Sequence, residues 1–310
     1  MILCCGEALI DMIPTATESG QSGFVPHSGG AIFNTAIALG RLGVQSGMLT
    51  GLSNDLFGQQ LTSALHASHV DTAMIVYSKA PTTLAFVELT DGHASYTFYD
   101  ENTAGRTLKS EDIPEISGEV GCMYFGGISL CSEPGADTYL KLAENEAEHR
   151  VIMIDPNIRA SFIEDVERYR DRLNAFFKIA DIIKVSDEDL NWIMPGAESL
   201  AEKVAKIGAF GPSLVIVTRG SEGAIAYLKD GRTITVPSNR VEIVDTVGAG
   251  DTFNAGVLAR LSELGLLTKA GISKIDALEV EDALAHGAKV AAVTVSRAGA
   301  NPPWAHELAQ

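Results

Sequence analysis

VEIVDTVGAGDTFNAGVLAR, residues 241–260, predicts a strand, a glycine-rich turn and a helix in direct succession. Its first four residues, VEIV, are typical of a strand, and the small and apolar residues after Asp251 fit a helix. Gly248 and Gly250 flank Ala249, so the backbone can turn tightly and expose consecutive N–H groups at the helix N-terminus. Such a cup, aided by the helix dipole, suits the negative charge of a phosphoryl group.

Asp251 stands at the rim of this cup, and two roles are open for it. As an ordinary acid in the first turn of a helix, it would gain up to about 1 kcal/mol from the helix dipole. As a general base, it would take the proton of a hydroxyl group beside the phosphate. The spacing of the residues does not separate the two roles.

The composition indicates a folded protein with a strong excess of acidic residues. The 310 residues are enough for one large α/β domain or two small ones, and 46% of them are hydrophobic. A net charge of −17, from 40 acids and 23 bases, argues against nucleic acid or an anionic membrane as the main partner. A cup of backbone N–H groups can still bind an anion without basic side chains.

The cysteines and the absence of targeting signals predict a cytoplasmic protein. The four cysteines form no C-x-x-C pair and have no histidine at metal-binding spacing, so we expect reduced, mostly buried thiols. No apolar run is long enough to span a membrane, and the N-terminus lacks the positive region of a signal peptide.

The alternation of apolar strands and helices predicts an α/β fold, a doubly wound, mostly parallel sheet with helices on both faces. We expect strands at residues 2–10, 47–51, 74–77, 120–125, 151–154, 182–185 and 214–217, with an antiparallel edge pair at 223–228 and 233–236. Helices are expected at residues 31–43, 53–68, 134–148, 164–178, 250–264 and 280–297.

A β-hairpin interrupts this series. The segments 83–89 and 94–99 flank a turn that contains Asp91 and Gly92. Such an insertion often forms a separate sheet over a site. We therefore expect a single domain, residues 1–310, with a β lid built from segments of about 12–28 and 81–104.

Polar residues recur where the predicted strands end. Because the carboxyl ends of parallel strands share one edge of a sheet, they predict a site there. The six residues are Asp11, Asp155, Asn157, Asp189, Thr218 and Asp251. Asn34 lies one turn into an apolar helix opened by Gly29 and Gly30, where it is either a buried hydrogen-bonding residue or a ligand contact.

Two motifs make the chain resemble the ribokinase-like (phosphofructokinase-B type) carbohydrate kinases over essentially its full length, closest to fructokinase-like members. They are GGAIFNTA at residues 29–36 and DTVGAGDTF at residues 245–253. Supporting matches are GEALID at 6–11, DPNIR at 155–159 and TRGSEG at 218–223. Ser186 and Asp189 depart from an Asn-x-x-Glu that is frequent in the family; the serine is common among fructokinase-like members.

The resemblance implies an ATP-dependent kinase that phosphorylates a sugar hydroxyl group. Asp251 would accept the hydroxyl proton, and the N–H groups of Gly248, Ala249 and Gly250 would form an anion hole. The sugar would contact Asp11, Gly29, Gly30, Asn34, Arg159 and Asp251. The nucleotide would contact Lys184, Thr218, Gly220, Gly223, Gly248 and Gly250, with His286 near the adenine.

The resemblance also implies ions and a partner. Asp189 would place Mg²⁺ through water molecules, and Asp245 would belong to a loop that binds a monovalent cation, with K⁺ as the optional cofactor. The lid of this family is often also the interface of a homodimer.

Fructose is the predicted substrate, and several alternatives remain open. A 2-keto-3-deoxygluconate kinase would hold the substrate carboxylate with Arg106 and Arg159, although Asp100 and Glu101 would repel it if they face the site. A ribokinase, a nucleoside kinase and a catalytically silent sugar-binding protein are the others. The sequence contains no G-x-x-x-x-G-K-[ST], which excludes a P-loop kinase, and no G-x-G-x-x-G after the first strand, which counts against a dinucleotide-dependent oxidoreductase.

Overall fold

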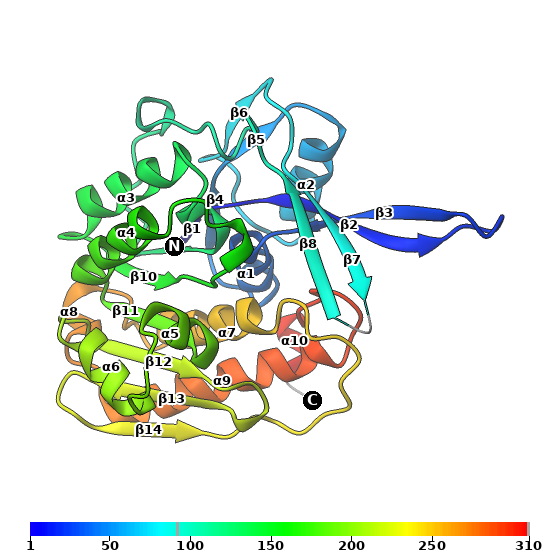
Figure 1. The fold of residues 1–310 in the computed structure, drawn as a ribbon. Helices are drawn as coiled ribbons and strands as arrows, with labels where there is room; N and C mark the ends of the chain where they lie inside the picture. The colour runs from blue at the N-terminus through cyan, green and yellow to red at the C-terminus, as the bar shows by residue number, and fades with distance from the viewer. Residues whose placement is uncertain (91–92, 309–310) are drawn as a thin grey trace.

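The computed structural model describes residues 1–90 and 93–308, and an eight-stranded sheet forms its centre (Figure 1). The strand order is β14-β13-β12-β11-β10-β9-β1-β4. The strands from β4 to β12 are parallel, and β13 and β14 add an antiparallel edge. They are β1 (Ile2–Cys5), β4 (Ser46–Leu49), β9 (Cys122–Gly126), β10 (Val151–Asp155), β11 (Ile182–Ser186), β12 (Leu214–Thr218), β13 (Ala224–Leu228) and β14 (Thr233–Val236).

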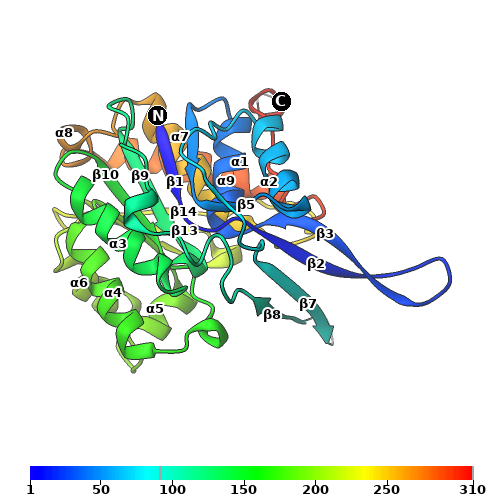
Figure 2. The same cartoon turned by 90° about the horizontal axis from the view of Figure 1, so that it is seen from above.

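Helices cover both faces of this sheet, as the sequence predicted (Figure 2). One face carries α1 (Ala31–Arg41), α2 (Leu56–Ala67), α7 (Ala249–Glu263), α8 (Lys269–Ile272) and α9 (Ala277–Val295). The other carries α3 (Gly135–Glu146), α4 (Val166–Ile179), α5 (Asp187–Ile193) and α6 (Leu200–Gly208). Alternate residues of β1 pack into the two cores, Ile2 and Cys4 into the first, Leu3 and Cys5 into the second.

This two-sided burial explains why the central strands read as continuous apolar runs in the sequence. A short helix, α10 (Ala305–Leu308), lies at the end of the described chain. Within residues 1–90 and 93–308, no helix has the length and apolar character needed to cross a membrane.

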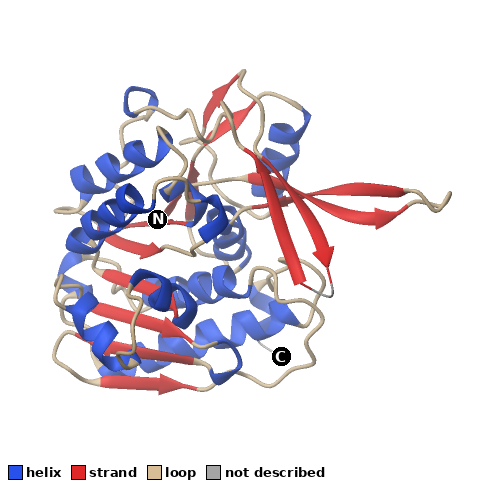
Figure 3. Ribbon diagram, viewed as in Figure 1, coloured by secondary structure: helices blue, strands red, loops and turns tan. Residues whose placement is uncertain are grey.

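A second sheet, ordered β3-β2-β7-β8, forms the lid (Figure 3). Its strands are β2 (Leu9–Ala16), β3 (Ser22–Gly29), β7 (Leu84–Thr90) and β8 (His93–Tyr99). The predicted hairpin pairs Leu84 with Tyr99, while its turn at residues 91–92 lies outside the described residues. The β2–β3 hairpin projects from the body of the molecule (Figure 1). A third, two-stranded sheet pairs β5 (Gly51–Ser53) with β6 (Val76–Ser78).

Two strand predictions were wrong. The apolar run 2–10 breaks at Gly6 and Glu7, so its first part joins the main sheet and its last part joins the lid. Asp11 therefore lies inside β2 and not at the end of a main-sheet strand. Residues 241–244 form a loop, with Ile243 62% and Val244 60% exposed, so α7 follows a loop and no strand directly precedes it.

The apolar pattern also missed the one-turn helices α8 and α10 and two longer helices, α5 and α6, which both begin with capping boxes. Ser186 pairs with Asp189 at the start of α5, and Ser199 pairs with Glu202 at the start of α6. In each case the serine accepts from a backbone N–H group, and the acid accepts from the serine N–H group. The S-x-x-[DE] pattern was the signal for these helices.

Candidate active site

The N-terminus of α7 forms the predicted cup of N–H groups. Gly248 precedes the helix with φ 76° and ψ 3°, a left-handed conformation that glycine adopts without strain. A Cβ atom at this position would lie 2.6 Å from the Cβ atom of Ala300. Among the residues that the structure describes, no side chain caps this terminus, and the first N–H groups of a helix have no partners within it. The N–H group of Ala249 donates to the carbonyl oxygen of Thr246 at 3.3 Å, and the cup is open to an anion through its other N–H groups.

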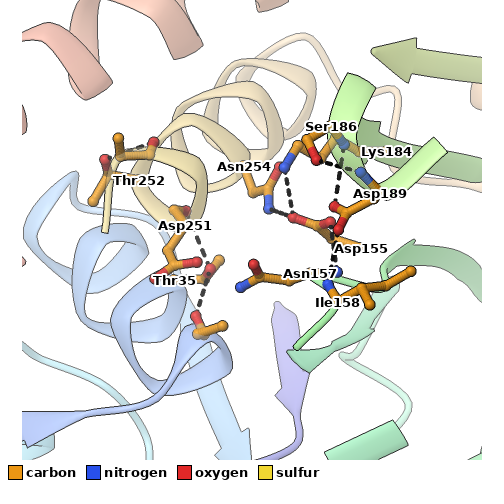
Figure 4. Close-up of polar contacts among 12 residues, drawn as sticks. Thr35, Asp155, Asn157, Ile158, Lys184, Ser186, Asp189, Asp251, Thr252 and Asn254 are labelled. Atoms are coloured by element: carbon orange, nitrogen blue, oxygen red, sulfur yellow. Dashed lines mark hydrogen bonds and ion pairs between the residues drawn. The ribbon is translucent and has the colours of Figure 1, made fainter. Parts of the chain in front are cut away.

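Asp251 lies in the first turn of α7 and is only 7% exposed (Figure 4). Its Oδ2 atom accepts a hydrogen bond of 2.9 Å from Nδ2 of Asn34, and its carbonyl oxygen accepts one of 3.1 Å from Oγ1 of Thr35. Burial raises the pKa of Asp251 to about 6, with a smaller rise from Asp155, and the Asn34 hydrogen bond acts against this rise. Helix α1 thus delivers the Asn34 amide directly to the candidate base.

Strands β10 and β11 bring a lysine and a carboxylate to the same place. Asp155 is 1% exposed, and its Oδ2 atom accepts hydrogen bonds from Nζ of Lys184 at 2.8 Å and Nδ2 of Asn254 at 2.7 Å. Burial lowers the pKa of Lys184, but the charge of Asp155 and its hydrogen bond outweigh burial and raise it overall. A Cβ atom on Gly250 would lie 3.5 Å from Nζ of Lys184, so the ammonium group borders the cup.

Asp189 helps to hold the start of α5 and is 8% exposed. Its Oδ1 atom accepts from the N–H group of Ile158 at 2.9 Å, and its Oδ2 atom accepts from that of Ser186 at 3.3 Å. Burial, and then the charge of Asp155, raise the pKa of Asp189. Each oxygen keeps a lone pair that a water molecule can use.

The residues at this edge fit a hydrated Mg²⁺ ion better than a closed metal site. In the described part of the chain, no group of three His, Cys, Asp or Glu residues could hold a metal ion. Mg²⁺ usually keeps several waters and is held by one or two carboxylates and substrate phosphates. Asp155 and Asp189 can serve in that way. Oδ1 of Asn254, buried beside Asp155, has no partner among the described residues and can accept a hydrogen bond from a metal-bound water.

The lid contributes Asp11 from its strand β2. A Cβ atom on Gly29 would lie 2.0 Å from Oδ2 of Asp11, so a glycine at this position leaves room for the carboxylate. Burial raises the pKa of Asp11 to about 6, with a smaller rise from Asp251, while Arg159 acts in the opposite direction. Arg159 also lowers the pKa of Asp251, so its charge reaches both carboxylates. Nη1 of Arg159 donates to Oδ1 of Asn157 at 2.8 Å.

Most of the predicted nucleotide contacts lie along the same edge of the sheet. Thr218 ends β12, and in the sheet register it lies next to Ser186. Gly220 and Gly223 follow it with φ values of 50° and 97°. A Cβ atom on Gly223 would lie 2.1 Å from the carbonyl oxygen of Val236, so this glycine permits the close packing of the edge strands.

His286 lies on α9, which packs against α7. Burial lowers its pKa, and the charges that act on it belong to Glu263, Arg260, Asp282 and Lys289. Gly287, the next residue, packs against α7 soon after Asp251: a Cβ atom on it would lie 2.9 Å from the carbonyl oxygen of Phe253 and 2.8 Å from Val257. A contact between His286 and the adenine stays a prediction.

Asp245 ties the loop before the cup to the segment after α9. Its Oδ1 atom accepts from the N–H group of Val247 at 3.0 Å, and its Oδ2 atom accepts from that of Gly299 at 2.8 Å. The N–H groups of Val244 and Asp245 both donate to the carbonyl oxygen of Val295. The predicted cation loop is thus held in place from both sides.

The sequence analysis gave no role to three residues near this site. Glu7 is buried, and burial raises its pKa to about 7. Tyr96, in the lid, has its pKa raised first by burial and then by Asp11, with smaller contributions from Asp245 and Asp251. Asn254 lies one turn after Asp251 on α7, a spacing that could have indicated it, because residues three apart share a helix face.

Asp251 does not line the hollow that the structure shows on the lid. This hollow has a volume of about 680 Å³, and the residues that line it include Pro14, Phe24, Phe86, Thr97 and Tyr99. Phe86 packs edge-on against both Phe24 and Tyr99, with ring centroids 5.0 and 5.4 Å apart. Asp11 lies on the opposite face of β2 from Pro14, because its distance along the strand is an odd number of residues.

The chain is similar to known proteins over nearly its full length. A model of the family described as "pfkB family carbohydrate kinase" matches residues 1–307. A fructokinase of Rhizobium leguminosarum bv. trifolii is 48% identical over 289 residues, which cover 93% of this chain and 86% of that protein.

Solved structures show the same fold. A fructokinase with bound ATP from Xylella fastidiosa has a TM-score of 0.90 and 27% identity, covering 99% of this chain and 97% of that one. A double mutant of a Vibrio cholerae fructokinase, in fructose, ADP and potassium ion bound form, has a TM-score of 0.84 and 25% identity. That match covers 96% of this chain and 93% of that one.

Proposed function

This chain belongs to the pfkB family of carbohydrate kinases, and we propose that it transfers the γ-phosphoryl group of MgATP to a hydroxyl group of fructose. The observation that carries this proposal is the uncapped N-terminus of α7 with the buried carboxylate of Asp251 in its first turn. The fructokinase relatives, one of them 48% identical, support fructose as the acceptor.

In the proposed reaction, Asp251 takes the proton of the sugar hydroxyl group. The hydroxyl oxygen attacks the γ-phosphorus, and the bond between that phosphorus and the ADP oxygen breaks. A pKa of about 6 keeps the carboxylate ionised at neutral pH and makes it a stronger base than an exposed aspartate. Asn34 occupies Oδ2 of Asp251, which leaves Oδ1 to face the hydroxyl group.

The cup and Lys184 would stabilise the charge on the transferred group. The N–H groups of residues 248–250 would act as donors, that of Ala249 after it leaves the carbonyl oxygen of Thr246, by analogy with oxyanion holes in which one donor contributes about 3–4 kcal/mol. Lys184 is paired with Asp155, but its ammonium group borders Gly250 and has further hydrogens to donate. Mg²⁺, when bound with ATP, supplies further charge neutralisation, and Asp155 and Asp189 would hold it through waters.

The nucleotide would extend from the cup along Thr218, Gly220 and Gly223. We place the adenine against the exposed apolar loop that contains Ile243 and Val244, because this loop leads directly into the cup, with His286 on α9 as a further predicted contact. Asp245, in the same loop, would help to bind K⁺.

The geometry favours a neutral sugar over a sugar acid. Arg106, which a keto acid would need, lies 3.5 Å from Oδ2 of Asp100 and donates to the carbonyl oxygen of Glu133 at 2.9 Å. Asp100 points into the body and does not face the sugar, so the predicted repulsion from Asp100 is not the reason. Arg106 is instead unavailable because its charge is already paired.

We further propose a homodimer that forms through the outer face of the lid. This face carries the hollow described above, and Phe24 and Tyr99 leave 47% and 61% of their surface exposed on it. Exposed aromatic residues in a group are typical of an interface.

A reducing compartment, the cytoplasm, is proposed from the four cysteines, all of which are free.

The test is ADP production from MgATP across a panel of acceptors, with Asp251→Asn as the blank. The panel contains fructose, ribose, 2-keto-3-deoxygluconate, tagatose and adenosine. Turnover of fructose above all others is the expected result. Preferred turnover of the keto acid would overturn the argument from Arg106, and no turnover of any acceptor with intact ATP binding would overturn the fructokinase proposal.

A further inference from the structure

The lid is joined to the body at four places, and two of them carry buried carboxylates. The chain enters the lid after β1 and before β7, and it leaves after β3 and after β8. Glu7 lies at the first entry and is 8% exposed. Asp100 follows β8 and is 5% exposed. Neither acid has a part in the phosphoryl transfer proposed above.

Glu7 connects the first entry to the first exit and to the body. Its Oε1 atom accepts from the N–H group of Ala31, the first residue of α1, at 2.9 Å. Its Oε2 atom accepts from the N–H group of Ser129 at 3.3 Å. A Cβ atom on Gly127 would lie 2.1 Å from Oε1 of Glu7, so the carboxylate fills the space above this glycine.

Asp100 makes the matching connection at the second entry and exit. Its Oδ1 atom accepts from Oγ1 of Thr83, just before β7, at 2.7 Å and from Oγ1 of Thr103 at 2.9 Å. Its Oδ2 atom accepts from Oγ of Ser132 at 2.9 Å and lies 3.5 Å from Nη1 of Arg106. Asp100 therefore fastens both ends of the β7–β8 hairpin to the body.

Both carboxylates reach the same segment of the body, residues 127–132, which we call the anchor loop. This loop follows β9, a central strand of the main sheet, and its Ile128 and Leu130 are buried. A small cavity of about 10 Å³, the size of one water molecule, lies between Glu7 and Asp100 and is lined by Ser129 and Ser132. The four crossings thus meet at one rigid support.

We propose that Glu7 and Asp100 are positioning residues. They fix the lid to the anchor loop, so that the side chains of Asp11 and Asn34 both lie where they can contact the acceptor sugar. Glu7 acts through the first turn of α1, which carries Asn34 and hence reaches Asp251. Asp100 acts through β7, which pairs with β2 at Asp11. The inference deepens the proposed function and rests on it, because it concerns the sugar side of that site.

The test compares Asp100→Asn with two milder changes, Ser132→Ala and Glu7→Gln, in the full-length protein. We expect Asp100→Asn to raise the sugar KM about tenfold, the effect of losing about 1.4 kcal/mol of positioning, with the ATP KM and kcat changed less than about threefold. ATP hydrolysis without sugar should rise relative to sugar phosphorylation, because a loose lid admits water. Ser132→Ala should raise the ratio of the sugar KM to the ATP KM, and the ratio of ATP hydrolysis to sugar phosphorylation, by smaller factors.

The matched control is Asp181→Asn. The side chain of Asp181 is 14% exposed, accepts from the N–H group of Ile152, as Glu7 accepts from backbone N–H groups, and pairs with Lys269, as Asp100 pairs with Arg106. It lies at the other edge of the sheet. This variant should lower the melting temperature and leave the ratio of the two KM values unchanged. If Asp100→Asn and Ser132→Ala behave like this control, the positioning role is overturned.

Hydrogen exchange provides a readout that does not depend on the substrate. In Asp100→Asn and Glu7→Gln, exchange should accelerate in β2 and β7 and stay slow in β9 to β12. If Asp100→Asn does not fold, the same comparison is made with Ser132→Ala. A wild-type protein without fructose turnover would overturn the proposed function, whereas unchanged lid exchange in the variants would overturn this inference alone.

Discussion

At the scale of single residues, Asp251 is a base whose strength is set by its surroundings. Burial and the neighbouring Asp155 favour the protonated form, while the hydrogen bond from Asn34 favours the ionised form. The balance gives a pKa of about 6, high enough for a useful base and low enough for ionisation at neutral pH. Two substitutions separate these contributions.

Asp251→Asn removes the base and keeps the shape of the side chain. We expect kcat to fall by about three orders of magnitude, the usual contribution of general base catalysis, with ATP binding close to normal. Steady-state ADP production and calorimetric titration with ATP measure the two effects. A variant that retains a tenth of the wild-type kcat would remove Asp251 from this role.

Asn34→Ala removes the hydrogen bond to Oδ2 of Asp251. Because that bond lowers the pKa of Asp251, its loss should move the acid limb of the kcat profile above pH 6, and the sugar KM should rise more than the ATP KM. The control is Asn191→Ala, at an exposed asparagine whose Oδ1 atom accepts from Nζ of Lys203 and has no contact with Asp251; it should change neither quantity. A larger rise in the ATP KM would place Asn34 outside the sugar site.

At the scale of elements, the start of α7 depends on a glycine with a left-handed backbone and no room for a side chain. Gly248→Ala would force a Cβ atom to within 2.6 Å of Ala300. We expect a loss of about 1–3 kcal/mol in the free energy of unfolding and a large fall in kcat, since the N–H groups would be displaced. Urea denaturation and steady-state kinetics measure the two losses.

Gly265→Ala, just after the other end of α7, is the control for this prediction. Gly265 has φ 72°, but a Cβ atom there would meet no atom within 4 Å. It should cost roughly 1 kcal/mol from backbone strain and leave kcat unchanged. An equal fall in kcat in both variants would show that backbone strain in α7, and not displacement of the N–H groups of the cup, lowers kcat.

At the scale of the whole molecule, buried acids make stability depend on pH. Glu7 has a pKa of about 7, and Asp11 and Asp251 have pKa values of about 6, all above the value of about 4 expected in the unfolded chain. The folded state therefore binds more protons than the unfolded state between pH 4 and 7, and stability from these groups falls as the pH rises through that window. His286, whose lowered pKa acts oppositely, is a single group.

We therefore expect a higher melting temperature at pH 5.5 than at pH 8. Scanning calorimetry at both values, at constant ionic strength, measures the difference. Glu7→Gln should reduce it, because the variant carries one raised pKa fewer. A melting temperature that rises from pH 5.5 to pH 8 would contradict the signs of these shifts.

The proposed dimer is also a property of the whole molecule. Phe24→Glu places a charge on the outer face of the lid and should convert the dimer to a monomer in size-exclusion chromatography with light scattering. Leu278→Glu, at a residue that is 75% exposed on α9, is the matched control and should leave the dimer intact. A monomeric wild type would contradict the proposal.

The sequence by itself determined most strands and helices of the main sheet and the position of the cup. These features are local: apolar periodicity fixes the elements, and the glycines around Ala249 fix a turn that other residues cannot make. For the same reason the lid hairpin and the antiparallel edge pair were correctly predicted. The prediction of a strand at 241–244 was wrong. The composition of this segment suits a strand, but whether it pairs with a sheet or stays exposed depends on distant segments.

Only the tertiary structure decided which of these residues meet. Asn34 and Asp251 are 217 residues apart, and their hydrogen bond exists because α1 packs against α7. The break at Glu7, the partners of Asp100 and the raised pKa values likewise depend on burial by distant segments. Burial and long-range contacts are properties of the packed chain. Local sequence patterns could therefore identify the candidate site residues but could not predict which of them are in contact.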